Sequence, residues 1–431
     1  MANKDSNVVI IGAGFAGLSA AKALTNAGWK NVKILEARDY VGGRTVTVDV
    51  GGAMIDAGAA WIHGDKNNPL CAMCDHYGIR YIAHPEMNTG AATIVDTKDD
   101  GARVKAWTAA EAEALTAKLG CIAIHTYLEN ANITDPTECR RIEFIVEQIA
   151  SGASGPAANF NAYYPINEIT GRLAKGYDQL IVGGYDALIK KVAEGLNIQL
   201  NQIVAKIEQP SDNGALTITC KDGSSEKADY CILTAPLGVL KKKSIAFNPP
   251  LPEAKVAAID KLDMGNYEKV IMVFEEKFWE GFSDLMEYKD GVTNLVLCND
   301  FKDGMRSFPV FAQANMTDEE KVKKARANLA AVLDKQESDI PACAATLCTG
   351  WTNDEFSYGG YSYFPVGSKP EDMDIVAEPA MGGRLMFAGE HCIKEHNASV
   401  HGPVISGLRE ALRLDDKAFI ENVTPGIIPS E

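Results

Sequence analysis

Three closely spaced glycines and one downstream carboxylate are the first residues that could bind a ligand. Gly12, Gly14 and Gly17 lie in Gly12-Ala-Gly14-Phe-Ala-Gly17, and Glu36 follows a helical segment. In this pattern the first glycine permits a tight turn, the second leaves room for a pyrophosphate, and the third lets a helix pack closely on a strand. A carboxylate at Glu36 can accept hydrogen bonds from both ribose hydroxyls and repels a 2'-phosphate. The pattern therefore predicts an adenine dinucleotide site and leaves NAD and FAD open.

A second glycine turn carries arginines that suit phosphate. Arg38 precedes Val41-Gly42-Gly43-Arg44-Thr45, and a planar guanidinium can donate two parallel hydrogen bonds to a phosphate. Ordinary surface arginines are the alternative. Residues 51–64 are again rich in glycine, which lets a backbone approach a flat ring system closely. We therefore expect a large planar ligand along this stretch.

Local patterns place these residues in a strand, turn, helix, strand unit. Residues 8–11 are all β-branched, residues 18–27 are rich in alanine and end before Gly28, and residues 32–36 form a second apolar run. Further along, the hydrophobic pattern predicts helices at 69–77, 109–131, 138–150, 186–195 and 318–336, with another starting near Pro403. It predicts strands at 198–207, 216–220, 230–234, 270–274, 295–299 and 310–313.

The length of 431 residues exceeds that of one hydrophobic core, so we expect two domains. The predicted fold class is α/β, with a Rossmann-like nucleotide domain built from both ends of the chain and a second domain made of two inserts. We assign residues 1–80, 196–248 and 365–431 to the first domain, and residues 81–195 and 249–364 to the second.

Charge and cysteine usage limit the partners and the compartment. With 42 Lys and Arg against 58 Asp and Glu, the net charge is −16, which disfavours nucleic acid and anionic membranes and favours small cationic ligands. Solubility alone is the alternative reason for this charge. No targeting segment is evident, because residues 8–24 are explained as strand plus helix and the last three residues are not a peroxisomal signal. Ten cysteines without a disulfide framework indicate reduced thiols, so we expect a cytoplasmic protein.

The sequence predicts no metal site. Cys71 and Cys74 form a single CxxC pair, which we interpret as two small residues on a helix because no second pair accompanies them. No His, Cys and carboxylate cluster occurs at ligand spacing.

Taken together, several motifs in order resemble those of the flavin-dependent amine oxidases, and within them the polyamine oxidase branch. The resemblance covers nearly the whole chain and is weakest between residues 90 and 165. The matching strings are Gly12 to Gly17 with Glu36, Gly42-Gly43-Arg44, Gly58-Ala-Ala-Trp-Ile-His-Gly64, Thr234-Ala-Pro-Leu-Gly-Val-Leu240, Met264-Gly-Asn-Tyr-Glu-Lys269, Trp351, Gly360-Tyr361-Ser-Tyr363, Phe387-Ala-Gly-Glu390 and Ser399-Val-His-Gly402.

The resemblance implies FAD and a two-domain fold of the hydroxybenzoate-hydroxylase type. It places Glu36 at the ribose, Arg38 and Arg44 near the pyrophosphate, Val204 by the adenine, and Glu390 with Val400 towards the ribityl chain and flavin. Monoamine oxidases attach the flavin to a cysteine, whereas Gly359-Gly360-Tyr361 contains none, so the FAD is expected to be non-covalent. Further residues implied to contact FAD are Ala16, Gly43, Ala60, Trp61, Trp351, Gly389 and Ser399.

The resemblance also implies a reaction. A neutral amine passes a hydride from the carbon beside its nitrogen to flavin N5, water hydrolyses the resulting imine, and dioxygen is reduced to hydrogen peroxide. Lys269 matches the family lysine that holds a water against N5. Because Lys269 precedes the apolar residues 270–274, a buried lysine here should have a lowered pKa or a fixed hydrogen-bond partner. A solvent-exposed lysine at a strand end is the alternative. The helix near Pro403 is expected to aim its N-terminal dipole at the flavin pyrimidine.

Four residues are implied to contact the substrate. Tyr361, and Tyr363 less directly, match positions where the family places an aromatic ring against the substrate nitrogen. His63 matches a substrate-contacting histidine of animal polyamine oxidases, with an ordinary core histidine as the alternative. The second cage aromatic of monoamine oxidases falls near Ser399 and is absent, which favours long, thin amines.

The sequence therefore predicts an oxidase of spermine, spermidine or their N-acetylated forms, acting on a small cationic amine with dioxygen. The alternatives are a flavin-type demethylase or chromatin module acting on protein lysine, an L-amino acid or other amine oxidase, and a flavin-binding protein without activity. An amino acid oxidase needs arginines for the substrate carboxylate, such as Arg140, Arg141 or Arg172, which the sequence does not place in the site. A demethylase is expected to carry an extra N-terminal helical domain and a long helical insert, and neither fits this sequence, because the dinucleotide motif begins at Val8 and no long heptad stretch interrupts the chain. The sequence has no signature of oligomeric state and is compatible with a monomer.

Overall fold

The computed structural model describes residues 3–83, 94–96, 102–104, 130–134, 176–211, 214–275, 278, 295–299, 316–333 and 335–423. At its centre lies a five-stranded sheet in the order β10-β2-β1-β14-β21, in which every neighbouring pair is parallel. These strands are β1 (Val8–Ile11), β2 (Val32–Leu35), β10 (Ile198–Gln199), β14 (Tyr230–Leu233) and β21 (Leu385–Phe387).

Strand β1 shows why its residues are all apolar. Side chains alternate across a strand, so Val8 and Ile10 enter one hydrophobic core while Val9 and Ile11 enter another. All four are buried, as expected for a parallel sheet covered on both faces. The predicted α/β class is confirmed.

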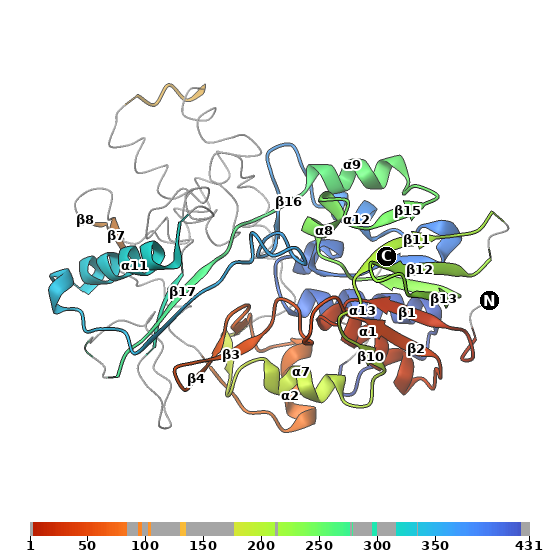
Figure 1. Ribbon diagram of the computed structural model, residues 1–431, viewed down its shortest axis with the longest axis horizontal. Helices are drawn as coiled ribbons and strands as arrows, with labels where there is room; N and C mark the ends of the chain where they lie inside the picture. The colour runs from red at the N-terminus through yellow and green to blue at the C-terminus, as the bar shows by residue number, and fades with distance from the viewer. Residues whose placement is uncertain are drawn as a thin grey trace.

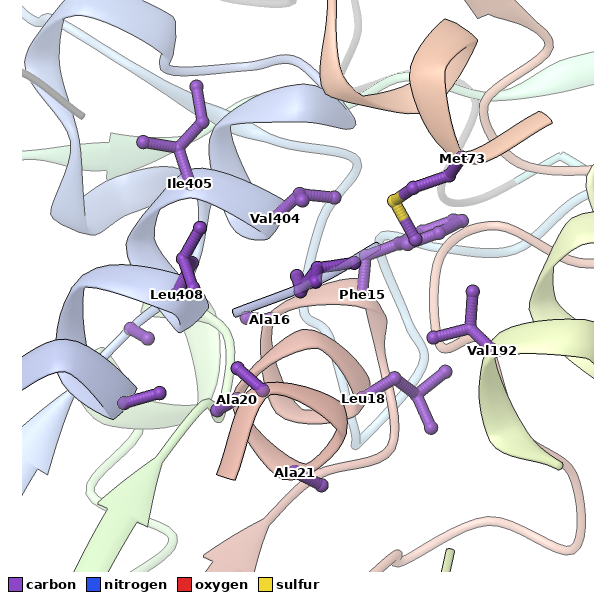
Figure 2. Close-up of a cluster of buried hydrophobic side chains, with 14 of the residues drawn as sticks. Phe15, Ala16, Leu18, Ala20, Ala21, Met73, Val192, Val404, Ile405 and Leu408 are labelled. Atoms are coloured by element: carbon purple, nitrogen blue, oxygen red, sulfur yellow. The ribbon is translucent and has the colours of Figure 1, made fainter. Parts of the chain in front are cut away.

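One face of the sheet is covered by a group of helices. Helix α1 follows β1 directly and packs on α13, where Figure 2 shows Ala16 and Ala20 opposite Val404 and Leu408. A Cβ added to Gly407 would lie 2.2 Å from the Ala16 carbonyl oxygen, so only glycine permits this close approach. The helices on this face are α1 (Phe15–Asn26), α2 (Pro69–Tyr77), α7 (Asp186–Ala193) and α13 (His401–Leu414).

The other face packs against a four-stranded sheet and three helices. The sheet has the order β13-β12-β11-β15, and side chains of β11 and β12 share a core with those of β1 and β14. These strands are β11 (Val204–Glu208), β12 (Leu216–Cys220), β13 (Ser225–Ala228) and β15 (Ala246–Asn248). The helices are α8 (Leu237–Lys241), α9 (Glu253–Lys261) and α12 (Glu371–Ala377).

A second region is built on one fully buried strand, β17 (Lys269–Val273). Val270 and Met272 pack with helix α11, while Ile271 and Val273 pack with the hairpin β3–β4. Figure 1 shows β17 and α11 at one end of the molecule and the five-stranded sheet at the other. The elements are β18 (Leu295–Asn299) and β19 (Ala345–Cys348) on either side of β17, α11 (Asp318–Leu333), β3 (Thr47–Val50) and β4 (Ala53–Asp56).

The described residues also form smaller sheets. Strand β9 lies between β5 and β6, β16 pairs with β20, and β7 pairs with β8. Their bounds are β5 (Trp61–Ile62), β6 (Tyr81–Ala83), β7 (Ile94–Asp96), β8 (Ala102–Val104), β9 (Gln179–Ile181), β16 (Asp263–Met264) and β20 (Ser362–Tyr363). Short 3-10 helices are η3 (Glu337–Asp339), η4 (Met381–Gly383), η5 (Glu390–Cys392) and η6 (Lys394–His396).

Most of the predicted elements that fall on described residues are confirmed. The helix at 69–77 has the predicted bounds. Residues 198–207, predicted as one strand, form two, because Asn201 has a φ of +58° and its N–H bonds to the Arg38 carbonyl instead of a neighbouring strand. The helix predicted at 138–150, nearly all of that at 109–131, and the strand at 310–313 lie outside the described residues.

The predicted domain boundaries stay a prediction. Two helices assigned to the second domain nevertheless pack against elements assigned to the first. Helix α7, assigned to the second domain, shares a core with β1 and α1. Side chains of α9, also assigned there, lie in the core beneath β11 and β12. In the described part of the chain, none of the helices has the length and apolar character needed to cross a bilayer.

Candidate active site

The turn between β1 and α1 forms an open cradle at the N-terminus of the helix. A Cβ added to Gly12 would lie 2.4 Å from Thr234 Oγ1, and one added to Gly17 would lie 2.0 Å from the Gly12 carbonyl oxygen. At Gly14 an added Cβ would meet only the Gly42 carbonyl oxygen, at 3.9 Å. Gly14 is the N-cap of α1 and no side chain caps this helix. The first amides of α1 are therefore suited to bind an anion.

Glu36 is fixed beside this cradle. Its buried carboxylate accepts hydrogen bonds from the Ala13 N–H at 2.6 Å and the Arg38 N–H at 2.8 Å. Burial raises the pKa of Glu36, while these two N–H donors act in the opposite direction. The structure thus brings the predicted ribose-binding carboxylate to the edge of the glycine turn.

Arg38 points to a partner that the sequence analysis did not name. Its guanidinium donates two hydrogen bonds to the Asp354 carboxylate, one from Nη1 to Oδ1 at 3.2 Å and one from Nη2 to Oδ2. Its role beside a pyrophosphate stays a prediction.

Arg44 links the second glycine turn to a buried carboxylate. Its Nη1 donates to the Gly360 carbonyl at 2.8 Å and to Glu390 Oε1 at 3.0 Å. Glu390 also accepts from the Ser362 N–H, the Ser362 hydroxyl and the Ala398 N–H. Burial alone would raise the pKa of Glu390, but Arg44 and the other donors outweigh it, so the pKa is lowered and the carboxylate is charged.

Lys269 is buried, and it has the fixed hydrogen-bond partners predicted for a buried lysine at this position. Its Nζ donates to the carbonyl oxygens of Asp56 at 2.8 Å and Gly58 at 2.5 Å, and lies 5.9 Å from the centre of the Trp61 ring. Burial lowers the pKa of Lys269 to about 8, while the Asp56 carboxylate acts in the opposite direction. The exposed alternative for this lysine is thereby excluded.

Two tryptophans lie along the same glycine-rich stretch. Trp351 Nε1 donates to the Ala57 carbonyl at 3.2 Å. The indole nitrogen of Trp61 is buried and has no hydrogen-bond partner among the described residues. A buried, unsatisfied donor is costly, so this N–H is available to a bound molecule. The adjacent Ala60 is also buried.

Tyr361 packs against a second ring that sequence reasoning missed. The centroids of Tyr361 and Tyr267 are 5.3 Å apart and the ring planes are inclined by 44°. Tyr267 approaches the backbone beside Tyr361 closely, since a Cβ added to Gly360 would lie 2.6 Å from Tyr267 Cβ. A signal was present: Tyr267 precedes Lys269 by two residues, the spacing that puts side chains on one side of an extended segment.

Two of the predicted substrate-contacting residues, Tyr363 and Ser399, form hydrogen bonds with other groups of the protein. Tyr363 is buried and its hydroxyl bonds to Asp263 Oδ2 at 3.3 Å. Ser399 donates to the His396 carbonyl at 2.6 Å and accepts from the Gly402 N–H, in the first turn of α13, at 3.1 Å. Neither arrangement tests whether these residues contact a substrate, so both assignments stay predictions.

His63 is only partly buried, with 35% of its side chain exposed, and it pairs with an acidic residue. Its Nδ1 lies 3.0 Å from Asp178 Oδ2, and Asp178 Oδ1 accepts from the Gly64 N–H at 3.0 Å. In the neutral tautomer whose Nδ1–H donates to this carboxylate, Nε2 is the acceptor nitrogen. Sequence reasoning did not name Asp178, which lies 115 residues from His63.

The remaining predicted cofactor residues lie around the nucleotide domain. Gly43 has a φ of +60° and faces Gly14, and Gly389 has a φ of +145° with its N–H bonded to Ser406. Val204 and Val400 are buried at the starts of β11 and α13. Among the described residues, no group of three or more His, Cys, Asp or Glu is placed to hold a metal ion.

Comparison with known proteins shows what this arrangement resembles. A family model described as flavin containing amine oxidoreductase matches residues 15–93 and 124–414. The chain is 30% identical to polyamine oxidase 4 of Oryza sativa subsp. japonica, covering 98% of this chain and 91% of that protein. It is also 30% identical to lysine-specific histone demethylase 1 homolog 1 of Arabidopsis thaliana, covering 95% of this chain and 52% of that protein. The chain thus spans about half the length of such demethylases.

Among solved structures, wild-type putrescine oxidase bound to putrescine superposes with a TM-score of 0.75. The two chains are 23% identical over 95% of this chain and 99% of that one. This similarity establishes a shared fold across nearly the whole chain.

Proposed function

Because the chain belongs to the flavin containing amine oxidoreductase family, we propose that it is an FAD-dependent oxidase of polyamines, namely spermine, spermidine or their N-acetylated forms. The similarity to a rice polyamine oxidase over 91% of that protein supports this substrate class. The net charge of −16 also favours a polycationic substrate, since long-range attraction raises the rate of encounter.

The described residues fit FAD, the cofactor of this family. Gly14 leaves open space where a side chain would project over the uncapped start of α1, and the carboxylate of Glu36 beside it would accept hydrogen bonds from a ribose. The unsatisfied N–H of Trp61 adds a donor close to Lys269. Bound FAD would supply the two-electron acceptor, and these residues would hold its dinucleotide end and ring system without a covalent bond.

The observation that carries the proposal is a pair of packed tyrosine rings, one of which belongs to a residue two positions along the chain from a buried lysine. Tyr267 and Tyr361 offer ring faces that can orient an amine nitrogen. Lys269 has a pKa of about 8 and donates from a water-poor site, which suits it to hold a small polar molecule. Together these residues would position an uncharged amine and restrict water around it.

A second polar group would act further along the substrate. His63 is partly exposed and is oriented by Asp178. A neutral imidazole with an acceptor Nε2 can bind an ammonium or secondary amine N–H of a long, thin substrate. This supports a linear polyamine over a compact aromatic amine.

A demethylase acting on protein lysine is the second candidate, because a plant histone demethylase is as similar to this chain as the polyamine oxidase is. An amino acid oxidase lacks support from the site: Arg38 and Arg44 are each paired with a carboxylate. Arg140, Arg141 and Arg172 lie outside the described residues.

The test is a peroxide assay on the purified, FAD-loaded protein. Spermine, spermidine, N1-acetylspermine, phenethylamine, L-amino acids and a dimethyl-lysine histone peptide would be compared at equal concentrations. Peroxide with one of the polyamines, at a kcat/KM at least about tenfold above the other classes, is the expected result. Peroxide with the peptide or the amino acids, and none with polyamines, would overturn the proposal.

A further inference from the structure

Asp354 joins two segments that are far apart in the sequence. It receives both guanidinium bonds of Arg38, a residue 316 positions earlier, in a side-by-side geometry. The two side chains are 12% and 20% exposed, so water screens this ion pair only weakly. A bidentate, charge-assisted pair fixes both position and orientation of a guanidinium.

Aromatic rings complete the surroundings of Arg38. The guanidinium carbon lies 5.5 Å from the ring centre of Tyr40, 5.8 Å from that of Trp351 and 5.4 Å from that of Phe356. These distances are within the range of cation–π attraction. The rings and the carboxylate together leave Arg38 with little rotamer freedom.

Asp354 is itself held by the turn that contains it. Its carboxylate accepts from the Ser357 hydroxyl at 2.6 Å and the Phe356 N–H at 3.2 Å, and its carbonyl accepts from the Tyr358 N–H at 2.8 Å. The same turn begins at Trp351, whose indole bonds to Ala57. The turn is therefore anchored to the glycine-rich stretch at one end and to Arg38 at the other.

We propose that Asp354 is a positioning residue for FAD, because it presets the Arg38 guanidinium at the dinucleotide turn before the cofactor binds. A guanidinium has five N–H donors and Asp354 uses two of them, so donors remain for the cofactor. Arg38 also lies two residues after Glu36 and donates its backbone N–H to that carboxylate. Fixing Arg38 thus also steadies the Glu36 position. This inference concerns cofactor binding and is independent of the substrate.

The experiment measures FAD retention, with activity playing no part. Purified holoenzyme is diluted, and released FAD is followed by recovery of flavin fluorescence. Asp354→Asn is expected to raise the dissociation constant of FAD by about tenfold, because it removes a charge-assisted bidentate pair. Glu355→Gln is the matched control: the adjacent carboxylate is exposed and pairs only loosely with Lys221, at 3.3 Å. Its dissociation constant should stay within about twofold of wild type.

A double-mutant cycle separates positioning of Arg38 from a general effect on the turn. In an Arg38→Lys background the planar fork is lost, so Asp354→Asn should add little further loss of FAD. FAD binding equal to wild type in Asp354→Asn would overturn the proposal, and so would an equal loss in both backgrounds. If Asp354→Asn does not fold, Asp354→Glu replaces it in the same double-mutant cycle, because the longer side chain shifts the carboxylate by one methylene. The same results for FAD binding would support or overturn the proposal.

Discussion

Lys269 and Trp351 together bind three successive carbonyl groups of one loop. Lys269 Nζ donates to Asp56 and Gly58, and Trp351 Nε1 donates to Ala57 between them. Glu268 links the two residues. It directly precedes Lys269 in the chain, and its carboxylate accepts a hydrogen bond from the backbone N–H of Trp351 at 3.0 Å. The loop that approaches the expected flavin is therefore held by side chains of the second region.

Replacement of Lys269 should affect chemistry more than folding. Lys269→Met removes the Nζ donor in a water-poor site, so we expect flavin reduction or reoxidation to slow by at least about tenfold. Because burial lowers the pKa of Lys269 to about 8, the wild-type rate should change as pH passes through about 8, and the variant should lack this change. Stopped-flow absorbance of the flavin measures both rates.

Lys255 provides the matched control for a buried lysine. It has a pKa that burial likewise lowers to about 8, and its Nζ donates to the carbonyls of Val376 and Glu378 at the end of α12. Lys255→Met should lower the melting temperature and leave both flavin rates near wild type. Unchanged rates in Lys269→Met would remove Lys269 from the mechanism.

The glycines of the first turn should respond differently to alanine. At Gly14 an added Cβ meets protein only at 3.9 Å, so Gly14→Ala should fold but release FAD, with a dissociation constant at least about tenfold higher. At Gly17 the Cβ would lie 2.0 Å from a carbonyl oxygen, so Gly17→Ala should reduce the yield of folded protein. Circular dichroism and flavin fluorescence separate the two effects. Full FAD retention by Gly14→Ala would show that the cofactor does not cross this position.

The two tyrosine rings should contribute to amine binding as a pair. Tyr361→Ala and Tyr267→Ala should each lower kcat/KM for the best amine by about tenfold, the scale of an aromatic contact. Tyr267→Phe keeps the ring and should stay close to wild type. Tyr363→Phe, which removes the hydroxyl that bonds to Asp263, tests the predicted substrate contact at that position. Equal activity of Tyr267→Ala and wild type would exclude Tyr267 from the site.

Asp56 should make stability depend on pH. Burial raises the pKa of Asp56 from 3.8 to about 6, so the folded state holds this proton more tightly than the unfolded state. The resulting stability is fully present below about pH 4 and is lost as pH rises through about 6, by at most about 3 kcal/mol.

The variant Asp56→Asn tests this dependence. An amide oxygen can still accept from the Thr47 hydroxyl and the Tyr185 N–H, so the fold should persist. Between pH 4 and 7 its free energy of unfolding, measured in urea, should fall less than that of wild type. The exposed Asp416→Asn is the control and should follow the wild-type curve. If the free energy of unfolding of Asp56→Asn falls with pH as steeply as that of wild type, the pH dependence belongs to other groups.

Sequence alone determined the nucleotide-binding unit and the environment of the buried lysine. The strand, turn, helix and second strand over residues 8–36 are neighbours in the chain, so local patterns and the requirements of glycine specify their geometry. The place of Lys269 beside apolar residues of β17 predicted a lowered pKa or a fixed hydrogen-bond partner for a buried lysine, and in the structure Lys269 is buried and its Nζ donates to two carbonyl oxygens. In both cases the physical cause lies within a few residues of the group concerned.

Only the tertiary structure decided which side chains meet. Asp354 with Arg38, Tyr267 with Tyr361 and Asp178 with His63 are pairs from segments about 95 to more than 300 residues apart. No periodicity in the sequence relates such segments, because their approach depends on how sheets and helices pack around β1 and β17. The sequence therefore names the residues capable of chemistry, and the packing of distant elements determines the partner that orients each one.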